Sequence, residues 1–149
     1  MVTNILIAFV IPWIFGYWLY KNEPIIVLTI APFSAVISYV MNCAGFYFGL
    51  WDIYPFGQEQ DFSGLPFDLG SFAVIGCFFV KLARERKRNI VFLMVGFTGL
   101  LTGIELIWLA LGRIHYHTGW NIYWTTLSYF LSVLVGYRYY QLLKKHGVL

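Results

Sequence analysis

Glu105 is the residue of this chain best suited to chemistry, because it lies inside a long apolar segment. A carboxylate within the hydrocarbon of a membrane costs about 2.5–3.5 kcal/mol unless it is paired, protonated or facing an aqueous cavity. Such a group can act as a general acid or base, or as a proton carrier. It can equally be a hydrogen-bonded tie between helices. We expect Asn42, at a matching position in another apolar segment, to be its partner, as an orienting residue, a tie or a substrate contact.

Asp68 is a second candidate carboxyl, in the sequence Leu65-Pro66-Phe67-Asp68 at the start of a further apolar segment. One interpretation is helix capping, since an acid near a helix N-terminus complements the helix dipole. The alternative is a second acid that closes the same pocket as Glu105. The three predicted catalytic residues are therefore Glu105, Asp68 and Asn42.

Arg113, His115 and His117 follow the same apolar segment as Glu105. Two imidazoles spaced as His-x-His could face a metal, but zinc needs three or four ligands, so we predict neither a metal nor a cofactor. Arg113 could pair with Glu105 or Asp52, contact a lipid head group together with His115, or be a snorkelling surface cation. Trp51 and Trp120 have the positions of an interfacial aromatic belt and are candidate lipid contacts.

The composition places these residues in a membrane protein. Of 149 residues, 60% are hydrophobic and 11% are charged, whereas soluble chains carry about 25% charged residues. This excludes soluble globular, disordered and nucleic-acid-binding proteins. The chain also lacks a Gly-x-Ser-x-Gly elbow, a phosphate-binding Gly-Lys-Ser/Thr loop and a dinucleotide fingerprint. Cys43 and Cys77 lie in apolar runs and are expected to be small buried residues.

Five segments are long and apolar enough to span a bilayer, which requires about 20 residues. The sequence therefore predicts an all-α fold: a polytopic membrane helix bundle with five transmembrane helices in one domain, residues 1–149. Pro12 and Pro32 lie inside spans and should kink them, with neighbouring helices meeting the freed carbonyls. The expected spans are about 3–20, 25–50, 66–82, 89–112 and 121–143.

The cations predict the orientation of the spans, since short loops rich in Lys and Arg stay in the cytoplasm. Arg113 alone falls on one side of the predicted spans, and the nine other Lys and Arg residues fall on the opposite side. We expect the N-terminus outside, the C-terminus inside, and residence in the cytoplasmic membrane. No Lys or Arg precedes Lys21, so a cleaved signal peptide is not predicted. The expected outer loop contains Asp52, Gly57, Glu59 and Asp61, and its acidic side chains are expected to keep the loop in water.

The second and third spans, and the fourth and fifth, are predicted to form two hairpins of the same orientation, a possible parallel repeat. Asn42 precedes Gly49 by the same spacing as Glu105 precedes Gly112. Parallel repeats commonly place a site at their interface. Small residues such as Gly99 and Gly103 are expected to let helices approach closely.

Several motifs resemble a family of small, uncharacterised multi-pass membrane proteins of endospore-forming Gram-positive bacteria. They are Asp52-Ile53-Tyr54-Pro55-Phe56 and Leu65-Pro66-Phe67-Asp68-Leu69, followed by Glu105, Leu111-Gly112, Trp120 and Tyr123. The resemblance implies a five-helix fold and no known activity. A Pro follows the fourth-span Glu in that family, where this chain has Leu106. More distantly, the chain is similar to small integral-membrane lycopene cyclases, although Asn42 replaces an acid and Asp68 stands alone where they carry paired acids.

Two function classes follow. The first is a non-catalytic lipid-binding, sensory or assembly component, with membrane lipids as partners. Its basic loop, Lys81–Arg88, would bind anionic lipid or a cytoplasmic partner, and a homo-oligomer is possible. The alternative is an intramembrane enzyme acting on a lipid or isoprenoid, with Glu105 as general acid or base at an outer-leaflet pocket. A transporter is weaker, since five short spans make a small pathway unless the protein dimerises.

Overall fold

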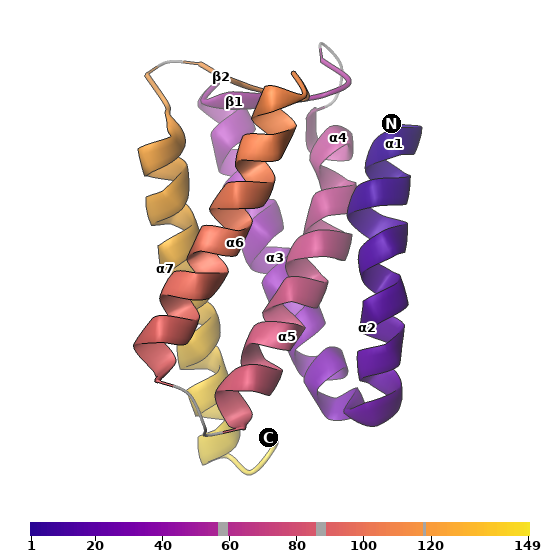
Figure 1. Ribbon diagram of the computed structural model, residues 1–149, viewed down its shortest axis with the longest axis vertical. Coiled ribbons are helices and arrows are strands. Elements are labelled where there is room, and N and C mark those ends of the chain that lie inside the picture. The colour runs from indigo at the N-terminus through magenta and orange to yellow at the C-terminus, as the bar shows by residue number, and fades with distance from the viewer. Residues whose placement is uncertain (57–59, 86–88, 118) are drawn as a thin grey trace.

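The computed structural model is a bundle of long, roughly aligned helices (Figure 1). It describes residues 1–56, 60–85, 89–117 and 119–149. The sequence expectations for Gly57 and Glu59, and for Arg86, Lys87 and Arg88 of the basic loop, lie outside the described residues. Both strands and the N-terminus lie at one end of the bundle, called the strand end here, and the C-terminus lies at the opposite end (Figure 1).

Within the described residues, four helical segments are long and apolar enough to cross a membrane. The first consists of α1 (Val2–Asn4), the π-helical turn η1 (Ile5–Val10) and α2 (Ile11–Asn22). The second is α3 (Pro24–Tyr47). The third consists of α4 (Gln60–Pro66), the π-helical turn η2 (Phe67–Phe72) and α5 (Ala73–Arg84), and the fourth is α6 (Ile90–Ala110).

A fifth helix, α7 (Ile122–Lys145), has 24 residues and packs along α6. It is less apolar than the other four because serine and tyrosine residues recur along it. The helical membrane-type bundle is therefore confirmed, with four segments meeting the criteria for a span.

The third helical segment begins earlier than the sequence predicts. The prediction took Pro66 as a first helical residue, but Pro66 ends α4, which begins at Gln60. Side-chain bonds hold this added turn to the preceding loop: Gln60 Oε1 accepts from the Ile53 amide at 2.8 Å, and Ser63 Oγ donates to the Pro55 carbonyl at 3.2 Å. Asp68 consequently lies inside the helical segment and does not cap its start.

Two short strands, which the sequence analysis missed, cover the strand end of the bundle (Figure 1). Strand β1 (Trp51–Ile53) pairs antiparallel with β2 (Ile114–Tyr116), with Ile53 opposite Ile114. β1 follows α3 and β2 follows α6, after the same kind of helix end. Gly49 (φ 60°) and Gly112 (φ 65°) both adopt the left-handed conformation that glycine tolerates best.

The first and third helical segments approach each other closely at their π-helical turns, η1 and η2. A Cβ at Gly70 would lie 2.0 Å from the Ala8 carbonyl oxygen, so only glycine fits there. Pro12 has no N–H to bond the Ala8 carbonyl one turn earlier, and the Ser71 hydroxyl donates to that carbonyl at 3.0 Å instead. The expectation that a neighbouring helix meets a carbonyl freed by proline is confirmed at Pro12.

The expected close packing at Gly99 and Gly103 is wrong within this chain. A Cβ added at either glycine would meet no neighbouring atom within 4 Å. The sequence reasoning found the spacing of a packing face but not its direction, and Gly99 faces outward from the bundle. The close approaches occur instead at Gly70 and at Gly76, whose added Cβ would lie 2.2 Å from Ser34 Oγ.

Candidate functional site

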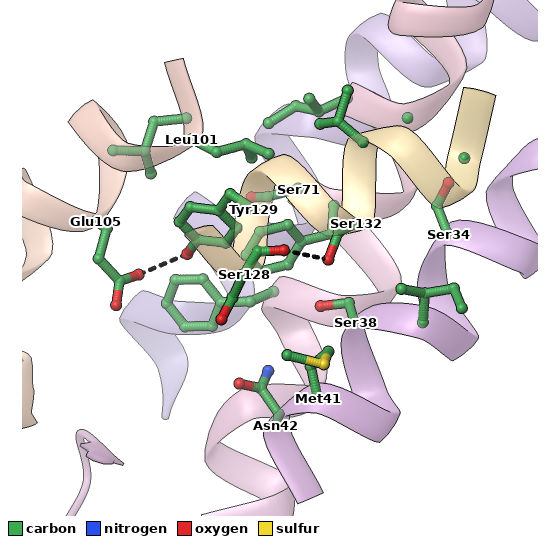
Figure 2. A pocket seen from close by; sticks show the side chains of 18 of the residues that line it. Ser34, Ser38, Met41, Asn42, Ser71, Leu101, Glu105, Ser128, Tyr129 and Ser132 are labelled. Atoms are coloured by element: carbon green, nitrogen blue, oxygen red, sulfur yellow. Dashed lines mark hydrogen bonds between the residues drawn. The ribbon is translucent and has the colours of Figure 1, made fainter. Parts of the chain in front are cut away.

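A cavity of about 140 Å³ lies between the two predicted hairpins. One wall comes from α3, η2 and α5, and the other from α6 and α7 (Figure 2). Its strand end is lined by Trp51 and Ile53 of β1, Ile114 of β2, and Trp120. Among the described residues, the wall is mostly apolar, with hydroxyls at intervals and one carboxyl, that of Glu105.

Tyrosines on two different elements hold Glu105 at the cavity wall. The Tyr129 hydroxyl of α7 donates to Oε2 at 2.8 Å, and the Tyr116 hydroxyl of β2 donates to Oε1 at 2.9 Å. Figure 2 shows Glu105 and Tyr129 joined in this way. Because each carboxyl oxygen has a donor, Glu105 is fixed in orientation and accepts on both sides.

The bond from Tyr116 is the last in a chain that begins at the strand end. Trp120 Nε1, which can only donate, bonds Thr125 Oγ1 at 2.8 Å. Thr125 then donates to the Tyr116 hydroxyl oxygen at 2.8 Å, and Tyr116 donates to Glu105. Burial raises the pKa of Tyr116 above its ordinary value of 10.0, so its hydroxyl keeps the hydrogen that it donates. Every donor in this series of hydrogen bonds therefore points toward Glu105.

Asn42 pairs with Asp68, and the expected pairing with Glu105 is wrong. Its Nδ2 donates to Asp68 Oδ1 at 2.7 Å, and its Oδ1 accepts from Trp51 Nε1 at 3.3 Å. Ser38 also donates to Asp68 Oδ1, at 2.5 Å. Sequence depth placed Asn42 and Glu105 at one level of the bundle, but they lie on opposite walls of the cavity, as Figure 2 shows.

Asp68 is fully buried, with 0% of its surface exposed, and lies behind Ser38 and Asn42. The residues that line the cavity include Ser38 and Asn42 but not Asp68. Its other oxygen, Oδ2, has no hydrogen-bond partner among the described residues. Asp68 thus ties η2 to α3. It holds Ser38 and Asn42 in place at the cavity wall but does not itself line the cavity.

Arg113 and His115, the expected head-group contacts, both lie outside the cavity lining. The Arg113 guanidinium lies 4.7 Å from the centre of the Tyr54 ring. His115 points away from the bundle, since its neighbours Ile114 and Tyr116 point inward, and its ring stacks on Phe56 at 4.5 Å. Trp51 and Trp120, whose rings are 4.9 Å apart, do line the cavity.

Sequence reasoning missed Tyr116 and Tyr129. The sequence analysis assigned neither residue a role, although Tyr129 lies at a similar depth to Glu105 in the hairpin of α6 and α7. That matching depth was the available signal. Within the described residues, no group of three or more His, Cys, Asp or Glu side chains could hold a metal ion.

Comparisons with known proteins suggest no function for this protein, so its function is argued from the geometry of the site. No family model matches the chain, and no curated protein or solved structure is significantly similar to it.

Proposed function

We propose that this chain crosses the cytoplasmic membrane five times, with the strand end outside and the C-terminus inside. The position of α7 supports a fifth span, because this 24-residue helix packs beside α6 and α3. The cations support the orientation. Lys21, Arg84, Lys144 and Lys145 belong to helix ends away from the strands, where the positive-inside rule expects them.

We propose further that the cavity binds one apolar or lipid molecule, and that the protein is a non-catalytic lipid-binding or sensory component. The observation that carries this proposal is the lining of the cavity: apolar on most of its wall, with one fixed carboxyl near the strand end. Ligand sites of proteins are typically apolar with few, well-placed polar groups. A carboxyl that served only to tie helices would need no such space beside it.

The experiment compares two glycines that each have open space around them. Gly136 lines the cavity, whereas Gly99 lies on the outward face of α6. Gly136→Leu should fill the cavity, and Gly99→Leu adds the same bulk elsewhere. Native mass spectrometry of the purified proteins should find a hydrophobic molecule on wild type and Gly99→Leu that Gly136→Leu has lost. Equal occupancy in all three proteins would contradict the proposal.

A second candidate is an intramembrane enzyme with Glu105 as general acid or base on an apolar substrate. The hydrogen bonds from Tyr116 and Tyr129 support it, because they hold the Glu105 carboxyl in one orientation at the wall of a mostly apolar cavity. Lipid mass spectrometry of cells with wild type or Glu105→Gln at matched levels tests this candidate. A lipid that changes with wild type alone favours the enzyme, and identical lipid profiles exclude it.

We also propose that the end opposite the strands contacts anionic lipid. Part of the basic loop is engaged within the chain: Arg84 pairs with Glu23 at 3.0 Å, and the Lys81 ammonium lies 4.5 Å from the centre of the Trp18 ring. Lys144 and Lys145 therefore carry more of this contact than the sequence suggested, at about 1 kcal/mol per cation near the membrane surface.

A further inference from the structure

Most of the hydroxyls that line the cavity, all except that of Ser34, donate their hydrogens to other groups of the protein. Ser38 donates to Asp68, Ser71 to the Ala8 carbonyl, and Ser128 and Ser132 to carbonyls of their own helix. Thr125 and Tyr129 donate within the chain of bonds around Glu105. A hydroxyl whose hydrogen is engaged offers a ligand only its lone pairs. The polar wall of the cavity is therefore mostly an acceptor surface.

The charged residues at the cavity wall also favour a ligand that donates hydrogen bonds. Glu105 is its one acidic lining residue, and no Lys, Arg or His is among the described residues that line it. A phosphate or carboxylate head group would meet a carboxyl and hydroxyl lone pairs with no cation to compensate, which is unfavourable in an apolar setting. Arg113, the expected head-group contact, is held over the Tyr54 ring away from this wall.

Aromatic rings surround the same part of the cavity. Trp51 and Trp120 lie at its strand end, Trp108 lies one turn along α6 from Glu105, and Phe72 lies 5.7 Å from the Tyr129 ring. The faces of such rings attract cations, most strongly where water is excluded. A carboxylate among aromatic rings suits an ammonium attached to an apolar body.

We propose that the ligand of this cavity is a hydrophobic amine in its protonated form, with the ammonium beside Glu105 and the apolar part along Phe33 and Ile75. This inference rests on the proposed ligand-binding function and names the chemical class of the ligand. The amine belongs either to a membrane lipid or to a free alkylamine.

The test uses three probes with the same chain: dodecylamine, dodecanol and dodecyl sulfate. Each is titrated into the full chain in phosphatidylcholine nanodiscs and followed by tryptophan fluorescence, because three tryptophans line the cavity. Wild type should bind the amine at least about ten-fold more tightly than the alcohol, and the sulfate least. Glu105→Gln should lose most of this preference. Glu85→Gln, which removes an exposed carboxyl outside the cavity lining, should keep it.

Adding sphingosine, a membrane lipid amine that carries no phosphate, to the nanodiscs separates the two sources of amine. Competition with the dodecylamine probe assigns the site to a lipid amine, and absence of competition assigns it to a free alkylamine.

Two results overturn the proposal in distinguishable ways. If wild type binds all three probes equally and saturably, and Gly136→Leu abolishes binding, the amine preference is wrong and the ligand-binding function stands. If no probe binds saturably, or Gly136→Leu changes nothing, both are wrong. The wild-type comparison needs no variant, so it decides the question even if Glu105→Gln does not fold.

Discussion

The Tyr129 hydroxyl donates a 2.8 Å hydrogen bond to Oε2 of Glu105 and joins α7 to α6 beside the cavity. The carboxyl is thereby fixed against the wall formed by its own hairpin. The opposite wall has its own tie between helices, in which Asn42 of α3 binds Asp68 of η2. Each predicted hairpin thus contains a polar tie centred on a carboxyl, and the cavity lies between the two hairpins.

Tyr129→Phe should destabilise the protein by about 1.5–3 kcal/mol, because a buried carboxyl loses a hydrogen bond. Thermal unfolding in detergent measures the effect. Tyr123→Phe is the matched control, since Tyr123 is 82% exposed. Equal stability of the two variants would show that the bond to Glu105 contributes nothing.

Asn42 should be energetically coupled to Asp68 and not to Glu105. A double-mutant cycle with Asn42→Ala and Asp68→Asn should give a coupling of about 1–3 kcal/mol, as expected for residues in direct contact. The cycle of Asn42→Ala with Glu105→Gln should be additive within about 0.5 kcal/mol. The reverse pattern, measured by the same unfolding assay, would restore the pairing that the sequence suggested.

Gly70→Ala should be far more harmful than Gly99→Ala. The added Cβ meets the Ala8 carbonyl and the Phe9 Cα at Gly70, both backbone atoms that cannot turn aside, and meets nothing within 4 Å at Gly99. We expect a loss of about 1–3 kcal/mol or more for Gly70→Ala, and an unchanged or slightly raised stability for Gly99→Ala. A tolerant Gly70 would contradict the close packing of η1 on η2.

The fifth span is tested by labelling on the two sides of α7. In a chain without Cys43 and Cys77, His115→Cys and Val148→Cys each introduce one thiol, and both positions are exposed. A membrane-impermeant maleimide added to intact cells should label His115→Cys and spare Val148→Cys until the cells are lysed. Labelling of both from the outside would place the two ends of α7 on one side.

The sequence was sufficient to locate the helices, which are recognised by the length of their apolar runs. It was insufficient for features that depend on the direction in which a side chain points. Apolar runs located the helices to within a few residues, except at Gln60, where a turn before Pro66 is stabilised by loop contacts. The strands were missed because three residues are too few for a pattern. Glu105, Trp51 and Trp120 were found because their residue types are informative at any orientation.

The pairing of polar residues could not be read from depth alone. Asn42 and Glu105 lie at equivalent places in two similar segments. The rotation of each helix about its axis nevertheless turns Asn42 toward Asp68 and Glu105 toward two tyrosines. The same uncertainty in rotation misdirected the packing assigned to Gly99.

Photo-crosslinking tests the central claim, that the cavity holds an apolar ligand, most directly. Membranes containing the protein are irradiated with a diazirine-bearing long-chain amine or alcohol, and the adducts are located by mass spectrometry. We predict adducts on cavity residues such as Ile75 and Ser132 in wild type, lost in Gly136→Leu, while adducts on the outward-facing Phe92 persist in both. Adducts confined to outward-facing residues such as Phe92 would contradict the claim.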